Sequence, residues 1–274
     1  LQVSYSNDDS FEWFGGSATC SYLVAYKGWD DDFDTDNGFD GEVSYCLSIR
    51  DPRIADTSQS NGFESDNNAS GAETTPFTSA HFKNVTMIGP KTIKNADFVN
   101  NGDYITAGDL FPDNGSKLGK FQAAVQIRRS SKLNISNLLA VGFPIGLIVD
   151  GEKGQSVAYA KNGDFKLENC IFSGMGVLGT DKNKEYEDYF YDYVTKKEDR
   201  SIVSFSHSFF LSGFGNKAID ENMLGLSDPA NTGQQYCPAT IISDGKGGFV
   251  GAFRDATDNW MSGWTNFDPQ NAVY

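Results

Sequence analysis

The composition of this 274-residue chain already limits what it can bind. A net charge of −15 argues against binding to the phosphate backbone of nucleic acids, and the sequence contains no apolar run long enough to span a membrane. Aromatic residues make up 14% of the chain and glycine occurs 29 times, a mixture typical of many short strands joined by tight corners.

An acidic motif occurs three times in the first quarter of the chain. The copies can be superposed on a shared phenylalanine, and in that register an acidic residue always follows it. The pairs are Phe11-Glu12, Phe33-Asp34 and Phe63-Glu64. The first two copies are 22 residues apart, and the segments Val3-Ser4-Tyr5 and Val24-Ala25-Tyr26 repeat at 21 residues. A period of about 20 to 50 residues is typical of a solenoid.

We therefore predict an all-β protein, a right-handed parallel β-helix in which residues 1–274 form a single domain with long loop insertions, one short helix and a C-terminal cap. Coils of such a solenoid stack ~4.8 Å apart, so the three acidic residues form a column of like charges. Because Leu1–Tyr5 already reads as strand, we expect a leader and earlier coils to precede this chain in a longer secreted protein.

A second signature begins near residue 84. Asn84, Asn137 and Asn169 are each followed by four mostly apolar residues and a glycine, and residues 208–213 repeat the pattern with serine in place of asparagine. Asparagine tolerates left-handed backbone, so the pattern predicts a strand that bends at this residue. We expect the amide side chains to bond to neighbouring coils.

The remaining segments are predicted as insertions. We expect a long loop carrying the third acidic motif at 51–80, a polar loop at 91–120 and a hairpin-like excursion at 151–163. Aromatic residues recur at helical spacing within 182–199 and predict a helix there.

The last third loses the repeat and ends in an aromatic cluster of Trp260, Trp264 and Phe267. We predict that this cluster covers an open end of the solenoid. A platform on which sugars stack is the alternative.

Carboxylates are the strongest candidates for a site. Asp32, Asp34 and Asp36 have the alternating spacing of an EF-hand loop, but Gly38 falls one place late and Val43 occupies the position that requires glutamate. A calcium site built across coils remains, and the alternative is a solvated acidic edge. The predicted ligands are Asp31, Asp32, Asp34, Asp36, Glu12, Glu64 and Asp66, with Asp9 as a further candidate.

Cysteine and histidine offer little chemistry. The four cysteines lack zinc-binding spacing, and we expect buried free thiols, with a disulfide between Cys20 and Cys46 as the alternative. His81 and His207 are placed at equivalent positions beside repeat strands, where an ordinary role is favoured over that of a catalytic base.

Several motifs together resemble a known family. They are residues 9–16, 31–38, 47–52, 60–67 and the ending 263–271. On these motifs the chain resembles the secreted or lipid-anchored right-handed β-helix proteins of Bacteroidetes and marine bacteria, which have a pectate-lyase-like fold. The resemblance implies the fold and an extracytoplasmic or cell-surface location, but it implies no activity.

Two functions follow as hypotheses. We predict a monomeric, calcium-stabilised surface protein that binds an extracellular glycan. The alternative is a calcium-dependent polysaccharide lyase or glycoside hydrolase, in which Arg50, Arg53 or Lys27 would act beside the acidic motif. No catalytic residue is assigned.

Overall fold

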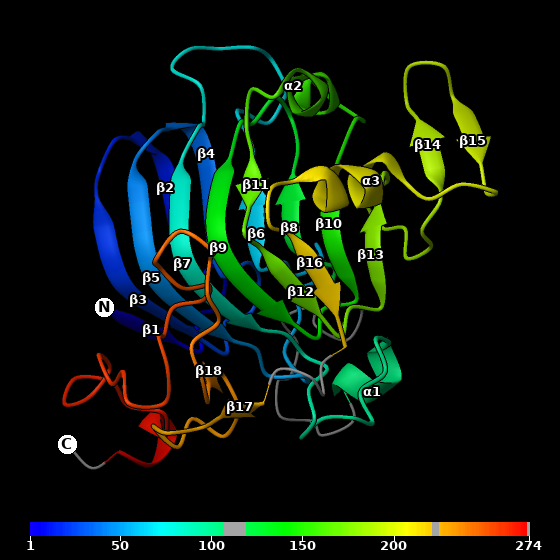
Figure 1. The fold of residues 1–274 in the computed structure, drawn as a ribbon. Helices are drawn as coiled ribbons and strands as arrows, with labels where there is room; N and C mark the ends of the chain where they lie inside the picture. The colour runs from blue at the N-terminus through cyan, green and yellow to red at the C-terminus, as the bar shows by residue number, and fades with distance from the viewer. Residues whose placement is uncertain (107–118, 221–224, 273–274) are drawn as a thin grey trace.

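The computed structural model describes residues 1–106, 119–220 and 225–272, and it confirms the parallel β-helix (Figure 1). Two parallel sheets run along the solenoid, and the strands of sheet A alternate along the chain with those of sheet B. Sheet A contains β1 (Gln2–Ser4), β3 (Cys20–Tyr26), β5 (Glu42–Ile49), β7 (His81–Ile88), β9 (Asn134–Val141), β11 (Leu167–Glu168), β12 (Ile171–Ser173) and β16 (Lys217–Ile219). Sheet B contains β2 (Phe11–Gly16), β4 (Phe33–Phe39), β6 (Phe63–Ser65), β8 (Ala123–Ile127), β10 (Ile145–Val149) and β13 (Val177–Thr180).

The predicted register of the acidic motifs is confirmed. Phe11 lies opposite Phe33, which lies opposite Phe63, so the residues that follow them form a column on sheet B. That column runs Glu12, Asp34, Glu64 and Gln126. The prediction for the first segment was wrong by one residue, because Val3 lies opposite Ala25 rather than Val24.

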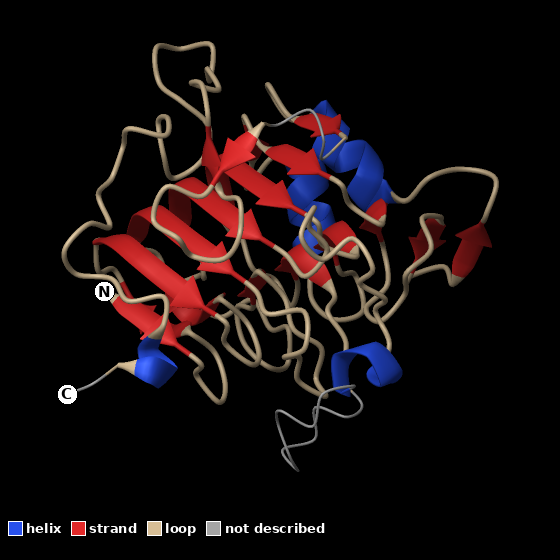
Figure 2. Ribbon diagram, turned by 90° about the horizontal axis from the view of Figure 1, so that it is seen from below, coloured by secondary structure: helices blue, strands red, loops and turns tan. Residues whose placement is uncertain are grey.

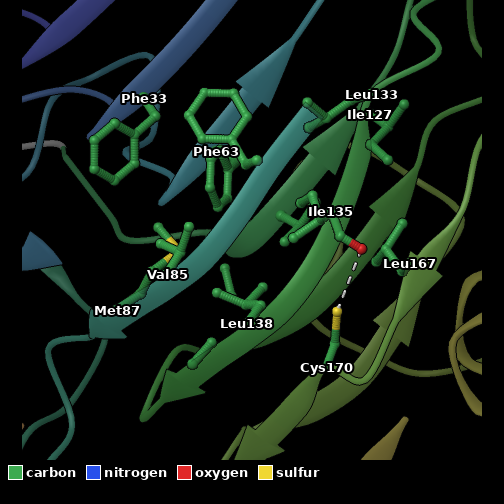
Figure 3. Close-up of a cluster of buried hydrophobic side chains, with 14 of the residues drawn as sticks. Phe33, Phe63, Val85, Met87, Ile127, Leu133, Ile135, Leu138, Leu167 and Cys170 are labelled. Carbon is green, nitrogen blue, oxygen red and sulfur yellow. Dashed lines mark hydrogen bonds between the residues drawn. The ribbon is translucent and has the colours of Figure 1, made fainter. Parts of the chain in front are cut away.

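The core lies between the two sheets and is rich in aromatic rings. Phe33 and Phe63 have ring centroids 5.4 Å apart, and Phe63 meets Phe82 of sheet A edge to face at 4.8 Å. Next to these rings lie aliphatic side chains such as Ile135 and Leu138, and Cys170 lies among them with Sγ 3.9 Å from the carbonyl oxygen of Ile135 (Figure 3).

The asparagine bends are confirmed as left-handed backbone. Asn84, Asn137 and Asn169 have φ of 55°, 58° and 52°. Tyr22 and Tyr45 stand in the same column and are also left-handed. The bend breaks the alternation of the strand, so that residues on both sides of it face the core. The prediction for the amide was wrong at Asn84, whose side chain donates to the carbonyls of Phe249 and Gly251 in the C-terminal segment.

The helices differ from those expected. The fourth repeat at 208–213 is not a strand, because Phe205–Ser212 forms helix α3, whose N-terminus is capped by the Ser204 hydroxyl. The excursion at 151–163 contains helix α2 (Ser156–Asn162), which ends at Gly163 with φ of 75°. A third helix, α1 (Gly102–Thr106), lies within the predicted 91–120 insertion, of which 107–118 fall outside the described residues.

The predicted helix over 182–199 was wrong. The segment holds an antiparallel hairpin of β14 (Phe190–Asp192) and β15 (Lys197–Asp199), which projects from the later coils (Figure 1). The residues that suggested a helix were Tyr186, Phe190, Tyr193 and Val194, and the ring of Tyr193 instead packs against that of Tyr191 edge to face at 4.9 Å.

The C-terminal segment covers the outer side of sheet A rather than an end of the solenoid. Residues Tyr236, Cys237, Val250, Ala252, Phe253 and Met261 pack on outward-facing apolar residues of β3, β5, β7, β9 and β12. The segment includes the short pair β17 (Leu226–Ser227) and β18 (Cys237–Pro238) and a final 3-10 helix, Pro269–Asn271. Figure 2 shows the stacked strands in red, with loops in tan lying across them.

The last coil is closed by α3. Its residue Phe210 is fully buried and stacks on Phe172 at 4.0 Å, within the core between the sheets. The predicted cap was therefore placed in the wrong segment, and the equivalence of His81 and His207 was also wrong, because His207 lies on this helix.

All four cysteines are free, and Cys46, Cys170 and Cys237 are buried as predicted. Cys20 lies opposite Val43 and Cys46 lies opposite Leu23. Among the described residues, none of the helices has the length and apolar character needed to cross a bilayer.

Candidate metal centre on the first coils

The carboxylates converge where the chain enters two neighbouring strands of sheet B. The corner before β2 is bonded to the corner before β4, since Ser10 N donates to Asp31 O at 2.9 Å. In addition, Asp31 N donates to Asp9 Oδ1 at 2.8 Å. These bonds fix the acidic corners one above the other.

Two groups of three carboxylates result. Asp9, Glu12 and Asp34 each offer an oxygen atom, and these atoms lie within 4.8 Å of one another. Asp8, Asp9 and Asp30 form a second group under the same limit. Asp9 belongs to both groups, so the two lie side by side. We refer to the five residues as the acidic face.

Asp34 contributes a buried oxygen atom to the acidic face. Its Oδ1 atom has no hydrogen-bond partner in the described part of the chain. Burial, together with the charges of Glu64 and Asp9, raises its pKa to about 9. Burial likewise raises the pKa of Asp9 to about 7, opposed by the bond from Asp31 N. A cation between these oxygens would relieve both effects.

The oxygen atoms of the first group fit a hard divalent cation. Calcium takes six to eight oxygen ligands, and carboxylates are its usual protein ligands. Three carboxylates supply about half of that number, so other oxygen atoms must complete the coordination. The acidic face could hold calcium through Asp9, Glu12 and Asp34.

Glu64 and Asp66 are neutralised by arginine instead. The guanidinium of Arg128 contacts Glu64 and also bonds to Asp66 at 2.8 Å, while Arg129 bonds to Asp66 at 2.6 Å. Burial raises the pKa of Glu64 to about 8, although Arg128 opposes this. These two predicted ligands therefore stand next to the acidic face but have protein partners.

Asp32 was predicted as a ligand, but it points into the solenoid. Its Oδ2 atom lies 3.3 Å from Nε of Arg50, and both side chains are fully buried. Arg50 also donates to the carbonyls of Gly28, Asp30 and Asn61. This interior arginine holds the corner that carries the acidic face.

The other predicted ligands are only partly gathered. The Asp31 carboxylate is buried and accepts from Asn61 N, and burial raises its pKa well above the usual range. Asp36 accepts from Asn37 N at 2.6 Å. The site includes Asp8 and Asp30, which the sequence reasoning missed although the 22-residue register aligns them.

Among the described residues, none of the predicted lyase bases forms an ion pair with a carboxylate of the acidic face. Arg50 is enclosed in the core, Arg53 lies over the ring of Tyr104 at 4.3 Å, and Lys27 pairs with Asp51 at 3.4 Å. His81 lies 3.1 Å from the Ser136 hydroxyl and His207 lies 2.6 Å from Asp188. Arg128 stands beside the column, in contact with Glu64.

A comparison with known families agrees with this architecture. Residues 1–206 match the family model described as the pectate-lyase-like β-helix domain. No significant match was found among curated proteins or among solved structures. Because the matched region covers three quarters of the chain and the strands form the expected parallel solenoid, the chain belongs to the family of pectate-lyase-like β-helix domains.

Proposed function

We propose that this protein is a secreted or surface-anchored glycan-binding protein whose first coils are stabilised by calcium. The observation that carries the proposal is the convergence of Asp9, Glu12 and Asp34 on one position, together with the unpartnered Oδ1 atom of Asp34. Hydroxyl or carboxylate oxygens of a sugar can complete the coordination of a calcium ion held by three carboxylates.

The small number of ligands suits a location outside the cell. Extracellular calcium-binding modules have dissociation constants of about 10⁻⁴ to 10⁻³ M. A site with three carboxylates and open positions belongs in that range, and it agrees with the location implied by the resemblance to secreted and lipid-anchored proteins.

Thermal melting in EDTA, then in millimolar calcium or magnesium, tests the metal. At about 100 times its dissociation constant, a ligand that binds only the folded chain adds about 2.7 kcal/mol, which raises the melting temperature by about 5 °C or more. Glycan binding is then measured with and without calcium. Equal melting temperatures in all three solutions would reject the metal site.

A second candidate is a calcium-dependent polysaccharide lyase, favoured by the position of Arg128 beside Glu64. In such an enzyme calcium neutralises a uronate carboxylate and a basic residue removes the adjacent proton. Ultraviolet absorbance of the unsaturated product, measured with polyuronates and calcium, distinguishes cleavage from binding.

A further inference from the structure

A cavity of about 190 Å³ lies among the insertions of the later coils, and no residue of the acidic face lines it. Its walls come from the segment around α2, from the β14–β15 hairpin and from the start of α3. Figure 1 shows these elements on the same side of the molecule. Four aromatic residues contribute to the lining: Phe190, Tyr191, Tyr193 and Phe205.

The size of the cavity suits one ring. An apolar protein cavity of about 150 Å³ is large enough to bind benzene, whereas pockets for drug-sized ligands begin near 300 Å³. Val194 at the lining is 91% exposed, and Lys161 is also exposed, so the cavity is open to solvent.

Both carboxylates of the lining already accept hydrogen bonds from the backbone. Asp181 accepts bonds from the backbone of Tyr191, Phe205 and Ser206, and Asp192 accepts from Val194 N and Thr195 N. A sugar ring would leave several hydroxyl groups without partners here, which costs about 1 to 3 kcal/mol for each buried group. An apolar ring avoids that cost.

Three lysines stand against the aromatic residues of the cavity. Lys161 Nζ lies 5.3 Å from the ring centre of Phe205, Lys182 Nζ lies 4.7 Å from that of Tyr191, and Lys196 Nζ lies 5.3 Å from that of Tyr193. Within the described ranges, no ion pair joins these three amines to a carboxylate, although the chain as a whole is strongly acidic. Of the three, only Lys161 lines the cavity, together with Asp181 and Asp192, whose oxygen atoms accept backbone hydrogen bonds. The amine of Lys161 is therefore the positive charge that an anion would meet.

We propose that the cavity binds a small compound with one aromatic ring and one carboxylate. The ring occupies the space between Val157 of α2 and the aromatic residues of the hairpin, and the carboxylate meets Lys161 at the mouth. This site is separate from the acidic face and does not depend on calcium.

Isothermal titration of the full chain with benzoate tests the proposal, with benzyl alcohol as the uncharged ring and glucuronate as the carboxylated sugar. We expect benzoate to bind at least about tenfold more tightly than either. Benzyl alcohol lacks the charge-assisted hydrogen bond, which contributes about 1.5 to 3 kcal/mol, and glucuronate has a carboxylate but lacks an apolar ring to pack on the aromatic side chains. Benzoate binding in EDTA should equal that in calcium.

Two variants locate the site. Lys161→Met should weaken benzoate binding about tenfold, whereas Lys161→Arg and the distant control Lys166→Met should leave it unchanged. Ala158→Phe, which fills the cavity, should abolish binding in a chain whose circular dichroism is unaltered. No benzoate binding, equal binding of benzyl alcohol, preference for glucuronate, or full binding by either Lys161→Met or Ala158→Phe would each overturn the assignment.

Discussion

The early and late coils share the same arrangement of strands but differ in their balance of acidic and basic residues. Residues 1–70 contain 14 acidic and three basic residues, whereas 151–200 contain ten acidic and eight basic residues. The column that begins with Glu12, Asp34 and Glu64 continues as Gln126, Ile148 and Thr180. The column carries carboxylates in the early coils and uncharged side chains in the later ones. Residues at equivalent positions of successive coils are therefore stacked on one another, although their side chains differ in charge.

The largest expected effect is on the interior of the early coils. Arg50→Met should reduce the free energy of unfolding by about 3 to 5 kcal/mol, because it leaves Asp32 buried without its partner. Arg200→Met in the late coils should leave the free energy of unfolding close to that of the wild type, since that arginine is 55% exposed. Urea unfolding measures the free energy of unfolding of both variants. An equal decrease in the two would contradict the contrast between the early and late coils.

The closure of the late coils depends on one ring. Phe210→Ala should cost about 3 to 5 kcal/mol, because the ring is fully buried against Phe172. Phe214→Ala is the matched control, because that ring is 61% exposed and its loss should change stability by less than about 0.5 kcal/mol. A loss below about 1 kcal/mol for Phe210→Ala would show that α3 does not close the core.

The acidic face and the neighbouring Glu64 should make the folded chain less stable as the pH rises. The folded-state pKa values of Asp9, Glu64 and Asp34 are raised to about 7, 8 and 9, so between about pH 4 and pH 9 the folded chain holds more protons than the unfolded chain. In EDTA the melting temperature should be highest near pH 4 to 5 and fall as the pH rises to about 9. Saturating calcium should flatten this slope, and an unchanged slope would count against a cation at this position.

The smallest expected effect comes from one carboxylate. At pH 8 in EDTA, Asp34→Asn should raise the melting temperature by roughly 2 to 4 °C, equivalent to about 1 kcal/mol, because asparagine is neutral at this pH, whereas the carboxyl of Asp34, with a folded-state pKa of about 9, must take up a proton when the chain folds. In the same variant, calcium should no longer raise the melting temperature. Asp40→Asn, at an exposed turn after β4, should behave as the wild type in both solutions.

The sequence predicted the coils well because their register depends on local spacing. The 22 residues between Phe11 and Phe33 stack one ring on the next, and the asparagines mark a bend that few other residues adopt. The same spacing predicted that Glu12 and Asp34 would meet. It did not reveal that Asp32 turns inward, because its partner Arg50 lies 18 residues away and no pattern links them.

The insertions were harder to predict because packing decides their structure. Ser204 is the N-cap of α3 and Gly163 is the C-cap of α2. Both residue types are typical at these helix ends, but the repeated strand pattern favoured other interpretations of the two segments. The hairpin at 190–199 left no comparable signal, since its aromatic residues fit helical spacing as well as they fit a hairpin. The cavity depends on contacts among three such insertions and was not foreseen.

The C-terminal segment changes how the solenoid is expected to unfold. Repeat proteins usually contact only neighbouring repeats, so they can lose structure one repeat at a time. Here the segment touches β3, β5, β7, β9 and β12 of sheet A, and Asn266 exchanges hydrogen bonds with Gln2 at 2.8 and 2.6 Å. Contacts between residues 264 positions apart couple strand β1 to the C-terminal segment. The chain should therefore melt in a single cooperative transition. It should fold slowly, because these contacts join residues that are far apart in the sequence.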